Sequence, residues 1–260
     1  MAETKLDYRG IFSFLALTFA ITYLVEGALI LGGFRITQIP AFYGQLSIAA
    51  VMWVPALGTF FTIKFITRER FAITNLRFGS WKPYIESALI VPACFVFIYG
   101  LTWLFKLGQP DWKLEQFQKM ISATTGTSIP SMPSPGVILL VLFVITLVTS
   151  PIINGLLGFG EELGWRGYLL PKLMPLGKLK AYLILGVVWG LWHLPLMLIG
   201  FTYTGYPLIG ILAFIALTTT LGIYINELTL HYNSSILAGW VHGVFNSQKS
   251  EARYMGSALP

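Results

Sequence analysis

The stretch Ile11–Leu31, with the sequence IFSFLALTFAITYLVEGALIL, decides the class of fold. Glu26 is its one acidic or basic side chain. A bilayer core about 30 Å thick is crossed by about 20 mostly apolar residues in a helix, so this stretch is long enough to span a membrane. It is too long for the core of a signal peptide, and it lacks a small-residue cleavage site. We therefore predict a transmembrane helix here.

The rest of the chain has the same apolar character. Hydrophobic residues make up 55% of the 260 residues and charged residues 11%, whereas an average soluble domain has roughly 25% charged residues. This composition excludes a soluble globular enzyme and a disordered chain. Six further stretches have spanning or nearly spanning length: Leu46–Ile66, Ser87–Phe105, Val137–Phe159, Ala181–Ile199, Leu208–Leu228 and Ser234–Ser247. The sequence predicts an all-α, polytopic membrane helix bundle that forms a single domain over residues 1–260.

Basic residues gather in two of the connections between the predicted spans. The net charge of +6 would point to nucleic acid in a soluble protein, but here the positive-inside rule accounts for it. The second-to-third connection holds Lys64, Arg68, Arg70, Arg77 and Lys82, and the fourth-to-fifth connection holds Arg166, Lys172, Lys178 and Lys180. We predict that both connections are cytoplasmic, that the protein contacts the lipid bilayer, and that it has no nucleic-acid partner.

Three segments place polar side chains within or beside predicted spans, where such groups are costly and are candidates for function. They are Glu161-Glu162-Leu163-Gly164-Trp165-Arg166, Trp189-Gly190-Leu191-Trp192-His193 and His242-Gly243-Val244-Phe245-Asn246. Side chains four residues apart share one face of a helix. His242 and Asn246 can therefore point at a common atom, and Glu162 can pair with Arg166. Glu161 lies about 100° around the helix from Glu162 and can face a different neighbour.

Glycines accompany these polar residues. A glycine lies three residues before each of Glu161, His193 and His242, where it leaves room for the polar side chain. The same segments contain the small-residue spacings Gly160/Gly164, Gly186/Gly190 and Gly239/Gly243. Such spacings favour tight packing of membrane helices, so they support convergence of the three segments.

The three segments resemble the CAAX-protease and bacteriocin-processing family of intramembrane proteases, which includes the Rce1-type prenyl protein endopeptidases. The family pattern is Glu-Glu-x-x-x-Arg, then Phe-x-x-x-His, then His-x-x-x-Asn. All three motifs occur here in order, over about Gly158–Asn246, with Trp189 in place of the phenylalanine. We expect Trp189 to preserve the packing role of that ring. Members often have eight spans, so the expected bundle has seven to eight transmembrane helices, with the catalytic helices within about residues 137–248.

The resemblance implies an intramembrane endopeptidase that cuts a peptide near the cytoplasmic membrane face, with prenylated CAAX-type C-terminal peptides as substrates. Glu161 would be the general base that activates water, assisted by His193. His242 and Asn246 would form the oxyanion hole. Glu162, Arg166 and Trp189 would be supporting residues.

The sequence leaves the requirement for metal open. Glu161, His193 and His242 could supply three ligands for a Zn²⁺ ion that activates water, and members of the family are commonly called metalloproteases. However, the usual His-Glu-x-x-His zinc motif is absent. Glutamate catalysis without metal and zinc catalysis are therefore both retained.

Each motif also has a simpler interpretation. Glu161, Glu162 and Arg166 could form an ion-paired helix end at the membrane interface. His193 could be a core histidine, and His242 and Asn246 could form an interhelical hydrogen bond.

Three further acids, Glu26, Glu86 and Glu227, are expected to be solvated or hydrogen-bonded rather than catalytic. The alternative functions are a proton- or ion-coupled transporter, and a non-catalytic immunity or regulatory membrane protein.

Overall fold

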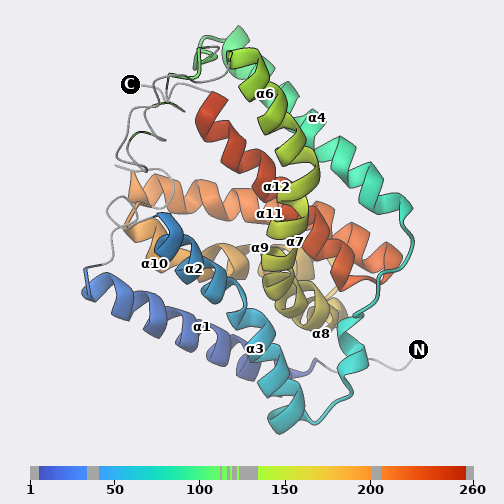
Figure 1. Ribbon diagram of the computed structural model, residues 1–260. Helices are drawn as coiled ribbons and strands as arrows, with labels where there is room; N and C mark the ends of the chain where they lie inside the picture. Colours follow the sequence, from blue (N-terminus) through green and yellow to red (C-terminus); the bar gives the residue numbers. More distant parts are fainter. Residues whose placement is uncertain are drawn as a thin grey trace. The chain divides into compact units, whose positions relative to one another are not determined.

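The computed structural model describes residues 6–33, 41–111, 113–115, 118, 122, 134–200 and 206–255, and within them it contains helices and no β-strand. The α-helices are α1 (Tyr8–Leu31), α2 (Ala41–Met52), α3 (Val54–Phe61), α4 (Lys82–Leu104), α6 (Pro135–Val144), α7 (Ser150–Glu162), α8 (Leu170–Leu173), α9 (Lys178–Trp192), α10 (Leu194–Leu198), α11 (Pro207–Tyr232) and α12 (Ser235–Met255) (Figure 1). Three π-helical segments, η1 (Thr62–Thr67), η3 (Ile145–Thr149) and η4 (Leu163–Leu169), extend or join these helices. Two short 3₁₀ segments are η2 (Phe71–Thr74) and η5 (Met174–Leu176). The all-α prediction is confirmed for these residues.

Within the part of the chain that the structure describes, four helical stretches are long and apolar enough to cross a membrane: Tyr8–Leu31, Ala49–Thr67, Lys82–Leu104 and Pro207–Tyr232. A fifth candidate is a pair bent by 41°, Gly136–Thr149 with Pro151–Leu176. Five of the seven predicted spans thus have a counterpart within the described residues. The larger count of seven to eight spans is not confirmed.

The fifth predicted span, Ala181–Ile199, is divided at one of its motif residues. Helix α9 ends at Trp192, His193 forms the junction with φ −84° and ψ 1°, and α10 begins at Leu194. Pro195 occupies the first turn of α10, where a missing N–H is tolerated because that group would be unpaired in any case. Neither piece reaches the length of about 20 residues that a continuous span needs.

The seventh predicted span, Ser234–Ser247, belongs to a longer helix. Helix α12 continues to Met255 through a polar stretch that includes Gln248, Lys249 and Glu251. These side chains explain why α12 is not among the candidate spans although it has 21 residues.

The chain packs as two compact units. The first comprises Met1–Ser80 and Leu157–Gly239, and the second comprises Trp81–Leu156 and Trp240–Pro260. The single domain that we expect over residues 1–260 stays a prediction.

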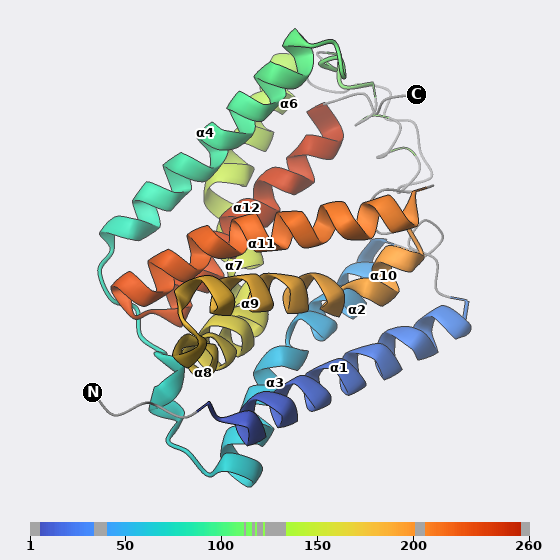
Figure 2. The same ribbon diagram turned by 180° about the vertical axis from the view of Figure 1, so that it is seen from behind.

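Within the first unit, α9 and α11 lie side by side (Figure 2). A Cβ atom on Gly186 would lie 2.6 Å from the Cα of Thr219, and one on Gly190 would lie 2.8 Å from the side chain of Ile215. Only glycine permits this approach, which brings the backbones of the two helices together. The predicted role of the Gly186/Gly190 spacing in close packing is confirmed.

The end of α7 is held in the same way. A Cβ atom on Gly160 would meet the carbonyl oxygen of Met52 at 2.7 Å, and one on Gly164 would meet the ring of Pro55 at 2.6 Å. On the other side, a Cβ atom on Gly239 would lie 2.8 Å from Phe159. These close contacts fix the helix end that carries the first motif.

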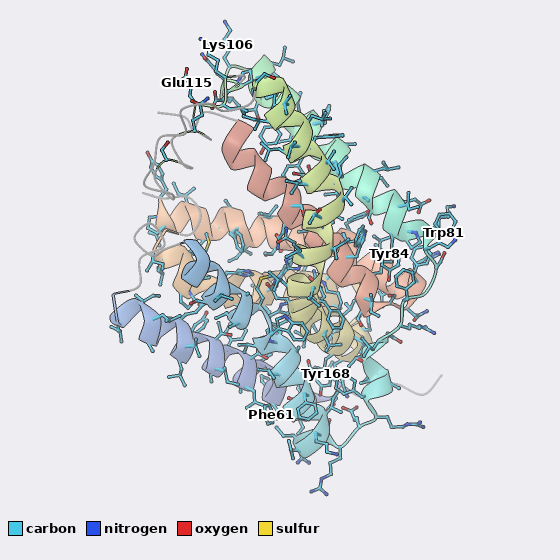
Figure 3. The ribbon with its side chains drawn as sticks, viewed as in Figure 1. Phe61, Trp81, Tyr84, Lys106, Glu115 and Tyr168 are labelled. Carbon is cyan, nitrogen blue, oxygen red and sulfur yellow. The ribbon has the colours of Figure 1, made fainter. Side chains whose placement is uncertain are left out.

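The second unit contains α4, α6 and most of α12. Tyr84 and Trp240 pack at a ring-centroid distance of 6.0 Å, and the indole N–H of Trp240 donates to the carbonyl oxygen of Tyr84 at 2.9 Å; Tyr84 lies near the start of α4 (Figure 3). Gly243 of α12 lies directly against the backbone of Gly155 in α7. The Gly239/Gly243 spacing therefore serves helix packing, as predicted.

Candidate functional site

Glu161 lies near the end of α7 with 2% of its surface exposed. Its Oε2 accepts a hydrogen bond of 2.8 Å from the indole N–H of Trp189 on α9. The first and second motifs are therefore joined by a direct contact. A hydrogen bond to a carboxylate is stronger than one between neutral groups, so this bond can set the orientation of the Glu161 side chain.

Glu162 and Arg166 form the ion pair that their spacing predicts. Nη1 of Arg166 lies 2.9 Å from Oε1 and 2.8 Å from Oε2 of Glu162, and both side chains are fully buried. Arg166 belongs to η4, the π-helical segment that follows α7. Single π-helical turns occur frequently at functional sites. The side chain of Arg166 is enclosed by protein, and the cytoplasmic location of this connection stays a prediction.

Arg166 links the first motif to two other helices. Its Nε donates to Oδ1 of Asn226 on α11 at 3.0 Å. Its guanidinium lies 4.3 Å from the centre of the Trp189 ring, which is a cation–π distance. Trp189 thus contacts both Glu161 and Arg166. Asn226 was not identified from the sequence, although its position inside a predicted span was a usable signal.

His193 is held at the α9–α10 junction by hydrogen bonding and by aromatic rings. Its Nδ1 lies 2.9 Å from the carbonyl oxygen of Trp189. A carbonyl can only accept, so Nδ1 donates the hydrogen in this contact. The rings of Trp192 and Phe214 lie 4.7 Å and 4.8 Å from the His193 ring, and both contacts are edge-on.

The third motif lies on α12. His242 is 4% exposed and Asn246 is half-buried. The two residues lie four apart on one continuous helix, so they share one face, as the sequence predicts. Their relation to Glu161 and His193 stays a prediction, because the second unit contains His242 and Asn246 and the first unit contains the other two residues.

Comparison with known proteins places all three motifs inside one family match. Residues 136–248 match the family model described as Type II CAAX prenyl endopeptidase Rce1-like. The match covers less than half of the chain, and it shows that this segment is similar to that family. A stretch of 44 residues is also 46% identical to CAAX prenyl protease 2 of Methanococcus maripaludis, and it covers 16% of this chain and 16% of that relative. The resemblance drawn from the motifs is confirmed, and the Rce1-like segment begins earlier than Gly158.

Metal ligands do not gather in the described structure. Among the residues that it covers, no three histidine, cysteine, aspartate or glutamate side chains lie together as a metal ion requires. Glu161 and His193 belong to the first unit and His242 to the second, so zinc binding by these three residues stays a prediction. The mechanism proposed below uses no step through a metal.

The three acids outside the motifs have different environments. Glu227 pairs with Lys178 at 2.6 Å and accepts from Tyr182 at 3.2 Å, and Glu86 lies exposed beside Lys82 at 3.5 Å. For these two residues the prediction of a solvated or hydrogen-bonded acid is confirmed. For Glu26 it is wrong. That side chain is 3% exposed, and its Oε2 is buried without a hydrogen-bond partner among the described residues.

Proposed function

We propose that this protein is an intramembrane endopeptidase that hydrolyses a peptide bond near the cytoplasmic membrane face, with prenylated CAAX-type C-terminal peptides as its substrates. The proposal is supported by the Rce1-like match over residues 136–248 and by the helices that are apolar enough to span a membrane. The matched stretch covers about one sixth of the length of CAAX prenyl protease 2. Activity and substrate are therefore proposed for this chain and are not transferred from the relative.

The observation that carries the proposal is the double contact of Trp189. Its indole N–H binds the carboxylate of Glu161, and its carbonyl oxygen binds Nδ1 of His193. One residue thus orients both groups that the family pattern assigns to water activation. Groups that are oriented before the reaction lower the barrier because they need no reorganisation when charge develops.

In the proposed reaction, Glu161 accepts a proton from a water molecule while the water oxygen attacks the carbonyl carbon of the scissile bond. His193 assists by accepting a hydrogen bond from the water at Nε2. His242 and Asn246 donate to the oxyanion of the tetrahedral intermediate, and each such donor is worth about 3–4 kcal/mol. When the C–N bond breaks, Glu161 returns the proton to the leaving amine. The side chains of Glu162 and Arg166 hold the end of α7 in place.

The test is cleavage of a fluorogenic peptide by the purified protein in liposomes, with the peptide supplied in prenylated and unprenylated forms. Cleavage of the prenylated form is expected, with losses of at least about 10³-fold in Glu161→Ala, His193→Ala and His242→Ala. Glu227→Gln is the control, because Glu227 is an acid outside the motifs. Retained cleavage in Glu161→Ala would remove the assigned base.

Two further readouts separate the alternatives. Elemental analysis of the active sample, with and without a chelator, tests the zinc hypothesis directly. A transporter would instead show substrate-coupled proton movement across the liposome membrane and no peptide cleavage.

A further inference from the structure

The junction between α9 and α10 sets the backbone contacts of His193. Its backbone N–H donates to the carbonyl oxygen of Gly190, three residues back, at 3.2 Å, whereas an α-helical bond would run four residues back to Trp189. Its carbonyl oxygen accepts from the N–H of Met197 at 3.1 Å, as the N-cap of α10. Because the turn is tighter than an α-helix, the Trp189 carbonyl can accept from the ring Nδ1 of His193 at 2.9 Å. The break in the helix therefore sets the direction of the His193 ring.

Pro195 deprives one carbonyl group near the end of α9 of its helical donor. In an uninterrupted helix, the carbonyl oxygen of Leu191 would accept from the backbone N–H of residue 195. Proline has no backbone N–H, so this bond cannot form. A buried carbonyl without a partner is costly, and more so inside a membrane. A donor from another helix therefore stabilises the break.

Tyr23 of α1 supplies such a donor. Its hydroxyl donates to the carbonyl oxygen of Leu191 at 2.6 Å. The ring of Phe19, four residues earlier on α1, packs against the Tyr23 ring at a centroid distance of 5.5 Å. Helices α1, α9 and α10 all belong to the first unit. The contact thus brings a residue from outside the matched segment, residues 136–248, to the second motif.

A second contact between α1 and α9 lies directly beside the first. The indole N–H of Trp192 donates to Oγ1 of Thr22 at 2.8 Å. This bond joins two side chains, whereas Tyr23 binds a backbone carbonyl two residues before His193. The two contacts join the same helices and differ in what they hold. They can therefore separate a positioning role from a packing role.

We propose that Tyr23 is a positioning residue for His193, and that its hydroxyl stabilises the helix break that directs the His193 ring. The inference rests on the proposed function, in which His193 accepts a hydrogen bond from the attacking water. Tyr23 itself contacts no substrate and transfers no proton. Without its hydroxyl, the Leu191 carbonyl competes for other donors, and the junction populates arrangements in which Nδ1 of His193 does not meet the Trp189 carbonyl.

The first test compares kcat and KM for the prenylated fluorogenic peptide in liposomes. Tyr23→Phe removes the hydroxyl and keeps the ring, so we expect kcat to fall about tenfold with KM unchanged, because a buried carbonyl loses its partner. Thr22→Val breaks the neighbouring bond to Trp192 and should keep kcat within about twofold. Each variant loses one hydrogen bond, so their melting temperatures should fall by similar amounts. Equal kcat values in the two variants would overturn the proposal.

The second test changes the proline that makes the hydroxyl necessary. Pro195→Ala restores a backbone N–H that can pair with the Leu191 carbonyl, and it should lower kcat because the helix can then continue through His193. In this background Tyr23→Phe should change kcat less than about twofold, since residues that act on one group are not additive. A further tenfold loss would show that the hydroxyl acts elsewhere, and it would overturn the proposal.

Nitrogen NMR of the histidine rings does not depend on activity. In protein with isotope-labelled histidine, the His193 signals, assigned with His193→Gln, report which ring nitrogen carries the hydrogen. The fraction with the hydrogen on Nδ1 should fall in Tyr23→Phe and keep the wild-type value in Thr22→Val. In the Pro195→Ala background, Tyr23→Phe should cause no further change.

The NMR result also separates this inference from the proposed function. If Tyr23→Phe keeps the wild-type signals of His193, the inference is wrong even when the protein cleaves peptides. If the signals change as expected but the wild type cleaves no peptide, the positioning role stands and the proposed function fails.

Discussion

The indole N–H of Trp189 reaches Oε2 of Glu161 at 2.8 Å, which puts a hydrogen-bond donor where the family pattern has a phenylalanine. From the sequence, this exchange of one aromatic residue for another was expected to preserve packing alone. The structure adds a polar contact to the packing, because the same ring also lies under the guanidinium of Arg166. Trp189 is therefore a positioning residue for Glu161.

The first prediction concerns Trp189→Phe, which removes the donor and keeps an aromatic ring. A hydrogen bond to a charged group contributes about 1.5–3 kcal/mol, so kcat should fall about tenfold or more while KM stays the same. Measured kcat and KM for the prenylated peptide test this expectation.

Trp192→Phe is the matched control, because Trp192 is also a buried α9 tryptophan with one indole hydrogen bond. Its partner is Thr22, which takes no part in the proposed chemistry. We expect a similar loss of thermal stability in the two variants and a loss of kcat only in Trp189→Phe. Equal kcat values in the two variants would contradict the positioning role.

The second prediction concerns the buried pair of Glu162 and Arg166. Removal of one partner of a buried ion pair costs about 3–5 kcal/mol, because the other charge stays buried. Glu162→Gln should therefore lower the free energy of unfolding by about 3 kcal/mol, measured by denaturant titration in detergent. The control is Glu86→Gln, which breaks the exposed pair with Lys82 at the same spacing and should cost less than about 0.5 kcal/mol.

Local spacing predicted part of the site correctly. The pairing of Glu162 with Arg166 and the shared face of His242 and Asn246 follow from helical periodicity, and the structure contains both features. The break of the fifth span at His193 did not follow, because an apolar run around Pro195 looks continuous in a hydropathy pattern. The burial of Glu26 could not be predicted either, since it depends on which face of α1 packs against distant segments.

The third prediction tests the close packing of α9 on α11. Gly186→Ala would place a Cβ atom 2.6 Å from the Cα of Thr219, and overpacking of this kind costs about 1–3 kcal/mol. Gly100→Ala in α4 is the control, because no atom lies within 4 Å of a Cβ there. Helix propensity should make that second variant up to about 1 kcal/mol more stable. Unfolding midpoints that shift in the same direction would contradict the packing account.

The fourth prediction concerns acid stability and Asp7, the N-cap residue of α1. Burial alone would raise the pKa of Asp7, but hydrogen bonds from the Lys172 ammonium at 2.7 Å and from the Gly10 N–H at 2.9 Å lower it below its ordinary value of 3.8. A carboxyl with a lowered pKa in the folded state stabilises the protein above its unfolded pKa, and this contribution is lost as the pH falls through the folded pKa.

Asp7→Asn removes this contribution, so it should lower the melting temperature near pH 6, and its difference from the wild type should shrink toward pH 3. Melting curves of both proteins across this range are the measurement. A difference that stays constant with pH would show that the carboxylate charge does not contribute.

We propose Glu161 as the base of a peptide hydrolysis. The most direct measurement is the rate at which Glu161→Gln cleaves a prenylated fluorogenic peptide, compared with the wild type and Glu227→Gln in liposomes of the same composition. If Glu161 is the base, the rate should fall about 10³-fold or more in Glu161→Gln and stay within about twofold of the wild type in Glu227→Gln. Cleavage by Glu161→Gln at the wild-type rate would contradict the role of Glu161 as the base.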